Sequence, residues 1–109
     1  MTIPMPTPVA DYFLHANALD ADAVAACFSQ DAEVRDEGHA YRGHDAIRAW
    51  KHATSARYGA IAHPVSCEMT PPGCIVQAEV TGNFPGSPAR IVFDFSLAGP
   101  AITALAIRA

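Results

Sequence analysis

The stretch "DAEVRDEG", residues 31–38, decides how the chain enters its sheet. Polar and apolar residues alternate along it, which predicts a strand whose successive side chains point to opposite faces. The alternation groups Ala32, Val34 and Asp36 on one face and Glu33, Arg35 and Glu37 on the other. Since Ala32 and Val34 mark the face that a sheet would bury, Asp36 is predicted to point inward.

Two helices are predicted before this strand. Large apolar residues at positions 9, 12, 13, 16 and 19 follow one face of a helix, and this spacing turns Tyr12 toward the interior. Residues 19–28, "LDADAVAACF", predict a second, short helix with Asp20 or Asp22 as its N-cap and with Phe28 on its buried stripe.

A third helix is predicted after the strand, beyond a turn that Gly38 and Gly43 bracket. The segment "HDAIRAWKHATS", residues 44–55, carries an inward stripe of Ile47, Trp50, Lys51 and Thr54. Lys51 lies on the buried face or at its edge. The exposed edge is the default expectation, because a lysine stem packs on apolar surface while its ammonium group reaches water.

The rest of the chain is predicted to form strands separated by the turn motifs "TPPG", "NFPGSP" and "LAGPA". Short loops make nearly all of these strands antiparallel neighbours. The last run, "AITALAIRA", is apolar on both faces, as a central strand would be. Helices followed by strands predict an α+β fold in which one antiparallel sheet packs its apolar face on a helix layer.

Composition limits the classes of function. With 109 residues, half of them apolar, the chain is expected to form one domain over residues 1–109, with residues 1–7 as a loose N-terminal arm. A net charge of −4 and seven scattered Lys and Arg residues argue against a nucleic-acid or anionic-membrane partner. The N-terminus lacks the pattern of a signal peptide, and no run approaches the roughly 18 apolar residues of a membrane span, so a cytoplasmic location is expected.

Cysteine and histidine spacings indicate no metal site. The three cysteines have no C-x-x-C spacing, and the five histidines lack the spacing of metal ligands. If Met69 opposes Cys74 across the "TPPG" loop, Cys67 opposes Val76, so the two sulfurs are diagonal neighbours with poor disulfide geometry. The cysteines are therefore predicted to be small buried hydrophobic residues.

Asp36 is the candidate for chemistry. A buried carboxylate without a cationic partner has a raised pKa, which suits a general acid or base, and an inward Tyr12 could donate a hydrogen bond beside it. The alternative is that Asp36 caps the turn before Gly38 and that Tyr12 is a core aromatic residue. His39 follows Asp36 by three residues and is a candidate gate or second proton carrier.

Other catalytic motifs are absent from the sequence. It contains no G-x-S-x-G, P-loop or dinucleotide-binding fingerprint. The segment "GNFPGSP" opens no helix and is predicted to be a hairpin loop rather than a phosphate cradle.

Four segments in family order resemble the nuclear transport factor 2-like superfamily, in the branch of SnoaL-like polyketide cyclases and ketosteroid isomerase. They are "DYFLHANALDADAVAACFSQDAEVRDEG", "YRGHDAIRAW", "VTGNFP" and "FDFSLAGPAITALAIR", and the most characteristic parts are "FSQDAEV" and "RGHDAIR". The resemblance implies a cone-shaped, cystatin-like fold whose N-terminal helices pack in a curved antiparallel sheet. It also implies a pocket at the open end and a homodimer through the outer face of the sheet.

By this resemblance, Asp36 matches the proton-transferring carboxylate of the isomerase and Tyr12 matches the tyrosine that holds the developing oxyanion; the pairing is the one described for ketosteroid isomerase itself. The second oxyanion donor falls at Phe93 here, and two supporting tyrosines fall at Phe28 and Lys51. Loss of one oxyanion donor costs on the order of 100-fold or more in rate, so true ketosteroid isomerase activity is not expected. Lys51 could replace the lost donor or could pair with Asp36 and silence it as a base.

Two functions remain open. The first is a candidate isomerase or cyclase, of lyase type and without cofactor or metal, that moves protons on a small apolar carbonyl compound. Asp36 and Tyr12 would serve with Lys51 and His39, and the substrate would contact Phe28, Val34, Trp50, Phe93 and Phe95. The alternative is a non-catalytic ligand-binding or dimerisation module whose cavity is filled by the same aromatic residues.

Overall fold

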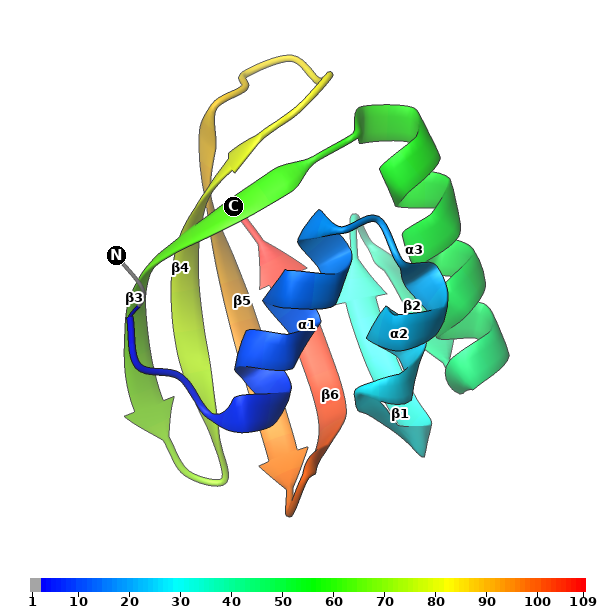
Figure 1. The fold of residues 1–109 in the computed structure, drawn as a ribbon, viewed down its shortest axis with the longest axis vertical. Helices are drawn as coiled ribbons and strands as arrows, with labels where there is room; N and C mark the ends of the chain where they lie inside the picture. Colours follow the sequence, from blue (N-terminus) through cyan, green and yellow to red (C-terminus); the bar gives the residue numbers. More distant parts are fainter. Residues whose placement is uncertain (1–2) are drawn as a thin grey trace.

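The computed structural model describes residues 3–109 and consists of three helices and six strands (Figure 1). The helices are α1 (Thr7–Asn17), α2 (Ala21–Ala26) and α3 (His44–Tyr58). The strands are β1 (Phe28–Asp36), β2 (His39–Arg42), β3 (Ile61–Thr70), β4 (Gly73–Thr81), β5 (Ala89–Ala98) and β6 (Ala101–Arg108).

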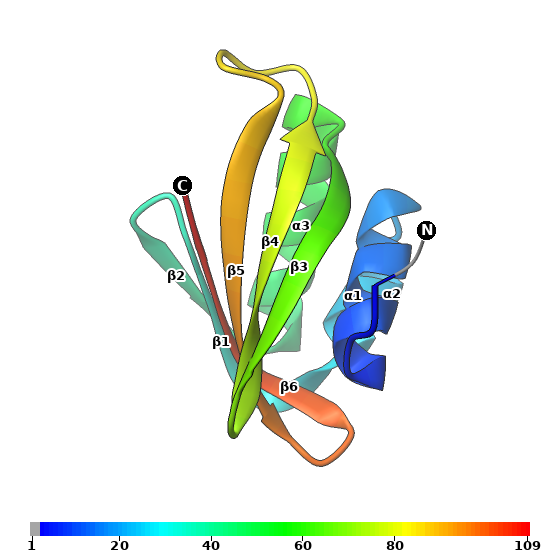
Figure 2. The same cartoon turned by 90° about the vertical axis from the view of Figure 1, so that its left-hand side faces the viewer.

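All six strands form one sheet in the order β2-β1-β6-β5-β4-β3. The sheet is strongly bent, and the β1–β2 arm diverges from β3 and β4 while the helices lie on the concave side (Figure 2). The predicted α+β class is confirmed. The strands pair antiparallel except β1 and β6, which pair parallel because the last strand inserts between the first strand and β5.

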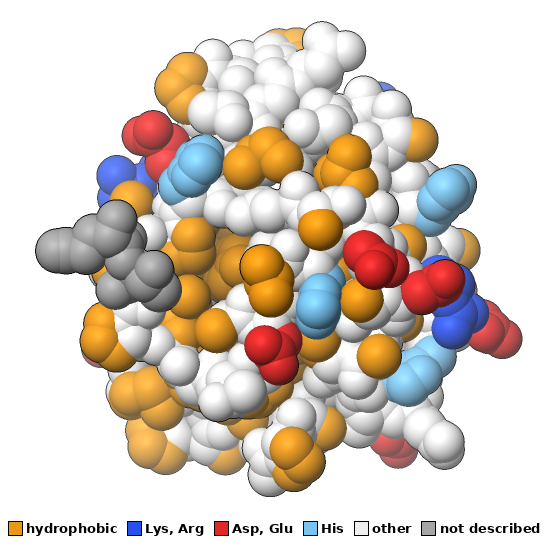
Figure 3. All heavy atoms as spheres, in the orientation of Figure 1, with side chains coloured by type: hydrophobic (Ala, Val, Ile, Leu, Met, Phe, Trp, Pro, Cys, Tyr) orange, Lys and Arg blue, Asp and Glu red, His pale blue; other side chains and the backbone are white. Residues whose placement is uncertain are grey.

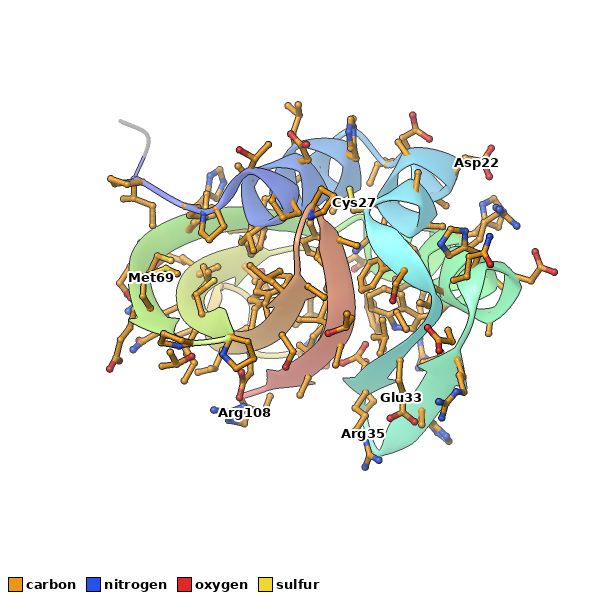
Figure 4. The ribbon with its side chains drawn as sticks, turned by 90° about the horizontal axis from the view of Figure 1, so that it is seen from below. Asp22, Cys27, Glu33, Arg35, Met69 and Arg108 are labelled. Carbon is orange, nitrogen blue, oxygen red and sulfur yellow. The ribbon has the colours of Figure 1, made fainter. Side chains whose placement is uncertain are left out.

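The alternation in residues 31–38 has the predicted effect. Ala32 and Val34 are buried and Asp36 is partly buried on the inner face, while Glu33 and Arg35 extend from the outer face of β1, away from the helices (Figure 4). Glu33 Oε1 accepts a hydrogen bond from Arg35 Nε at 3.4 Å on that outer face.

Helix α1 lies across the concave face of the sheet. Its buried residues are Val9, Tyr12, Phe13 and Ala16, which confirms the predicted helical stripe except at Leu19, which lies beyond the end of the helix and is exposed. Asn17 fixes the end of this helix to the edge strand β3: its Nδ2 donates to the carbonyl of Ala62 at 2.8 Å, and its Oδ1 accepts from the Ala62 N–H at 2.9 Å. No local sequence pattern announced this link, because the two residues are 45 positions apart.

The core lies between the helices and the inner face of the sheet. Its fully buried members include Val24, Val34, Ile47, Val76 and Leu105. Figure 3 shows that on the face of Figure 1 hydrophobic side chains gather mainly left of the centre, whereas acidic and histidine side chains prevail on the right, over α2 and α3.

Two sequence expectations need correction. Phe28 begins β1 instead of lying on α2, because α2 stops at Ala26. Asp20 is the N-cap of α2 and accepts the Ala23 N–H at 3.1 Å. The segment between Gly38 and Gly43 is not only a turn, since it contains β2. The tight turn is Glu37–Gly38, where both residues have positive φ (53° and 78°), as two-residue hairpin turns often require.

The structure describes only part of the expected loose arm, residues 1–7. Positions 1 and 2 lie outside the described residues, Met5 packs against the core, and α1 already begins at Thr7. No helix within residues 3–109 has the length and apolar character to cross a membrane.

The predicted cysteine register is confirmed. Met69 opposes Cys74 and Cys67 opposes Val76 across the β3–β4 hairpin. Cys74 is buried, whereas Cys27 and Cys67 are only partly buried, so the expectation of three buried cysteines is correct for one.

Candidate functional site

A pocket of about 570 Å³ opens between the end of β1, the second half of α3 and the inner face of β5 and β6. Its lining is a mixture of aromatic and aliphatic side chains with a few ionisable groups. The lining includes Tyr12, Asp36, Glu37, Trp50, Lys51, Arg57, Tyr58, Phe84, Pro85, Ile91, Phe93, Ile107 and Arg108. A concave, mostly apolar site with a few converging polar groups is typical of small-molecule binding sites.

Asp36 is held on the wall of this pocket by α3. Trp50 Nε1 donates a hydrogen bond to Asp36 Oδ2 at 3.0 Å, and the indole is itself only 4 % exposed. Burial raises the pKa of Asp36, and the charge of Glu37 raises it further. The Trp50 hydrogen bond and the ammonium of Lys51 act in the opposite direction, and the net effect is a pKa above the ordinary value of an aspartate.

Lys51 lies on the pocket wall beside Trp50. Its Nζ is 5.3 Å from the centre of the Trp50 ring, and its side chain is partly buried. Burial lowers the pKa of Lys51, while the charge of Asp36 opposes this shift. The ion pairs of residues 3–109 do not include Lys51 with Asp36, so a direct pair that silences Asp36 does not form.

Tyr12 separates the pocket from the closed core. Its ring makes edge contacts with Phe13 and Phe95, at centroid distances of 5.2 and 5.5 Å, and lies 6.1 Å from Phe28 and 6.3 Å from Phe93. Burial, followed by the charge of Asp36, raises the pKa of its phenol, which therefore stays protonated and able to donate a hydrogen bond.

The rim of the pocket contains residues that sequence reasoning missed. Helix α3 ends at Tyr58 because Gly59 takes the left-handed conformation (φ 56°), and the Tyr58 hydroxyl donates to Glu37 Oε1 at 3.2 Å. The loop after β4 packs on this end, with the Asn83 N–H bonded to the Tyr58 carbonyl at 2.7 Å and the Phe84 ring 6.1 Å from the Tyr58 ring. The aromatic residue in "GNFPGSP" was the available signal, although its position over the pocket depends on the fold.

The structure brings together only some of the proposed substrate contacts. Trp50 and Phe93 line the pocket together with the proposed catalytic residues Asp36, Tyr12 and Lys51. In contrast, Phe28, Val34 and Phe95 are buried in the core and do not line the pocket. The Tyr12 ring packs edge-on against Phe28 and Phe95, and Val34 lies two residues before Asp36 on β1, deeper in the core.

His39 does not line the pocket. It begins β2 opposite Asp36, but its side chain is exposed and lies next to Tyr41, at a centroid distance of 6.4 Å. As direct cross-strand partners, Asp36 and His39 share one face of the β1–β2 hairpin, but the His39 imidazole is exposed there. The role of His39 as a gate or second proton carrier stays a prediction.

A second, polar hollow lies between the α1–α2 connection and α3. There Arg48 contacts two carboxylates, Asp22 at 2.8 Å and Asp45 at 2.9 Å, on the exposed surface. In the part of the chain that the structure describes, no three His, Cys, Asp or Glu side chains are arranged to hold a metal ion. The pocket around Asp36 is therefore the stronger candidate site.

Comparisons with known proteins agree with this architecture. The family model of the SnoaL-like domain matches residues 9–97. A candidate polyketide cyclase from Sinorhizobium meliloti has 33% sequence identity and a TM-score of 0.92, with 95% of each chain covered. No significant match was found among curated proteins.

Two further solved structures have lower identity. A protein from Sphaerobacter thermophilus is 28% identical, with a TM-score of 0.74 and coverage of 93% of this chain and 91% of that one. A protein with a ketosteroid isomerase-like fold from Catenulispora acidiphila, solved in complex with trimethylamine, is 18% identical, with a TM-score of 0.87 and coverage of 97% and 87%; it shows the shared fold alone. The match over residues 9–97, the bent sheet and the pocket at its open end together place the chain in the SnoaL-like domain family, within the nuclear transport factor 2-like superfamily.

Proposed function

We propose that this protein transfers protons at the carbon next to the carbonyl group of a small, largely apolar ligand, as an isomerase or cyclase. The observation that carries the proposal is the Asp36 carboxylate, held at 3.0 Å by the Trp50 indole N–H on the wall of an apolar pocket of about 570 Å³. A carboxyl group in such surroundings suits general acid–base chemistry, because its raised pKa brings it closer to the operating pH.

Each polar residue has a distinct role in this proposal. The Asp36 carboxylate removes the α-proton and returns it to the same carbon or to a conjugated one. Tyr12 donates its phenolic hydrogen to the carbonyl oxygen, where negative charge develops. The Trp50 hydrogen bond fixes the orientation of the carboxylate toward the substrate proton.

The aromatic walls would select the ligand. Phe93 and Ile107 form one side of the pocket, and Phe84 and Tyr58 form the rim. These contacts suit a ring-containing carbonyl compound, since aromatic side chains supply large apolar contact areas.

A non-catalytic ligand-binding protein is the second candidate, and one observation favours it. Phe93 lines the pocket at the position that resembles the second oxyanion donor of the isomerase, and its ring offers no hydrogen bond. With a single donor from Tyr12, the pocket would hold a carbonyl ligand but stabilise its enolate less.

Deuterium exchange separates the two functions. Wild type and variants are incubated in heavy water with cyclohexanone or a fused-ring ketone, the loss of α-proton signals is followed by NMR, and binding is followed separately by Trp50 fluorescence. Asp36→Asn should abolish exchange while binding persists. Glu33→Gln is the matched control, because it neutralises a carboxylate on the opposite, outer face of the same strand.

Exchange that persists unchanged in Asp36→Asn would refute the role of this carboxylate. Saturable quenching without exchange in the wild type would favour the binding protein. If neither quenching nor exchange occurs with any of the ketones, the proposed ligand class is wrong.

A further inference from the structure

The chain contains a single lysine, and the fold places it on the pocket wall. The other basic residues are six arginines, and of the 109 residues Lys51 alone carries a primary amine in its side chain. Exposed surfaces usually carry several lysines, so this distribution is unusual. It places the one side-chain amine beside Asp36, Tyr12 and Trp50.

The surroundings of the amine leave it available to a ligand. Among residues 3–109, no ion pair or side-chain hydrogen bond involves Lys51 Nζ, and its nearest recorded contact is the face of the Trp50 ring, at 5.3 Å from the centroid. The ionisable groups that share the pocket with it are Tyr12 from α1, Asp36 and Glu37 from the end of β1, Arg57 and Tyr58 from α3, and Arg108 from β6. Arg108 is partly neutralised by Asp94, at 3.5 Å.

We propose that Lys51 forms an imine with the carbonyl carbon of a ketone or aldehyde bound in this pocket. The inference rests on the proposed function, since it assigns the same pocket to carbonyl ligands, and it names the group that activates them. A protonated imine withdraws electrons from the neighbouring carbon more strongly than a neutral ketone does. It would thus supply the activation that Phe93 cannot supply as an oxyanion donor.

The chemical steps balance within the site. Neutral Nζ forms a bond to the carbonyl carbon, the π-electron pair moves to the oxygen, and that oxygen takes up a proton, which Tyr12 is placed to donate. The Tyr12 phenolate then takes a proton from Nζ and is restored, and the carboxyl form of Asp36 protonates the hydroxyl group as it leaves as water, which leaves Asp36 as a carboxylate. The product is an iminium ion, whose positive charge faces the Asp36 carboxylate and the Trp50 ring.

Burial favours the neutral amine that this reaction needs. It lowers the pKa of Lys51, although the nearby Asp36 carboxylate limits the shift. An ordinary lysine, with a pKa of about 10.4, is only on the order of 0.1% neutral at neutral pH, and each tenfold gain in neutral fraction corresponds to one unit of pKa. Lowered lysine pKa values are a recurring means of activating amine nucleophiles.

Reductive trapping tests the proposal directly. The protein is incubated with cyclohexanone and sodium cyanoborohydride, which reduces an iminium ion to a stable secondary amine, and the modified residue is located by peptide mass spectrometry. The α-amine of the chain is an internal reference, and Nα-acetyl-lysine in the same solution is the external one. Lys51→Arg keeps the positive charge but removes the nucleophile.

We expect Lys51 to be trapped at least tenfold faster than Nα-acetyl-lysine, and cyclohexanol, which fills the pocket without a carbonyl group, to slow the trapping. Lys51→Arg should be labelled at the α-amine alone. Trapping of Lys51 no faster than Nα-acetyl-lysine, or insensitive to cyclohexanol, would overturn the imine.

The two proposals fail in different ways. Deuterium exchange that persists in Lys51→Arg without any trapping in the wild type would leave the function of Asp36 intact and remove only the imine. Fast trapping without exchange would establish the imine and refute proton transfer by Asp36.

Discussion

Replacing Trp50 with Phe should raise the pKa of Asp36, because it removes the indole N–H that donates to Oδ2 at 3.0 Å. A hydrogen bond to a charged group contributes about 1.5–3 kcal/mol. Since Asp36 is partly exposed, water replaces part of the lost bond, and we expect the carboxylate to lose about 1 kcal/mol. This loss corresponds to an about fivefold higher proton affinity of Asp36.

The direction of the effect follows from the protonation states. The Trp50 N–H stabilises the charged form of Asp36, so its removal extends the neutral form to higher pH. The rising limb of the pH profile for deuterium exchange should move to higher pH, so that its midpoint falls at an about fivefold lower proton concentration. Burial of Asp36 is retained in the variant and continues to raise its pKa.

Carbon-13 NMR of the Asp36 carboxyl group, followed across its titration, measures this change without relying on activity. Tyr41→Phe is the matched control: the Tyr41 ring lies 6.1 Å from the Trp50 ring, but the hydrogen bond to Asp36 comes from Trp50. Circular dichroism verifies that both variants are folded. An Asp36 pKa that is unchanged or lower in Trp50→Phe would refute the electrostatic account of the site.

Three further results are expected. Asp36→Asn should raise the melting temperature at neutral pH, because burial raises the pKa of Asp36 in the folded protein. The wild-type protein has its full stability below the unfolded pKa of 3.8 and loses part of it as the pH rises through the folded pKa, where the buried carboxyl group ionises. The advantage of the variant should therefore vanish in acid when melting temperatures are measured across a pH series. Tyr12→Ala should lower the free energy of unfolding by about 3–5 kcal/mol in urea titrations, because it removes the ring contacts with Phe13 and Phe95. Tyr12→Phe keeps these contacts and should change the free energy of unfolding by no more than about 1 kcal/mol. Equal losses in the two variants would contradict the placement of the hydroxyl at the pocket. Asn17→Ala should cost about 1–3 kcal/mol, because it leaves the N–H and carbonyl of Ala62 without their partner, and a protein of unchanged stability would show that water replaces both bonds.

Local periodicity made the orientation of the site predictable. The period-two pattern of residues 31–38 put Asp36 on the same face as Val34, and the stripe of α3 put Trp50 toward it. The cysteine register could also be predicted, since a short hairpin loop fixes which residues of its two strands face each other. Each of these features depends on neighbours within a few positions along the chain.

The lining of the pocket depends on contacts between distant segments. Phe28 and Phe95 are as apolar as Phe93, yet they are buried in the core and do not line the pocket, while Phe84 reaches the rim from a loop that the sequence marked only as a hairpin. Burial of an aromatic residue is encoded locally, but the side of the core on which it lies is not.

By itself, the sequence determined the fold class, the inward face of β1 and the identity of Asp36 as a candidate acid or base, because these follow from side-chain periods along single elements. Tertiary structure alone decided that β6 pairs in parallel with β1 and that the Trp50 N–H donates a hydrogen bond to Asp36. It also decided that Lys51 faces the pocket without an ion pair to that carboxylate. The physical reason is that hydrogen bonds and burial at the site come from residues that are distant in the chain, and only the bending of the sheet fixes their separation in space.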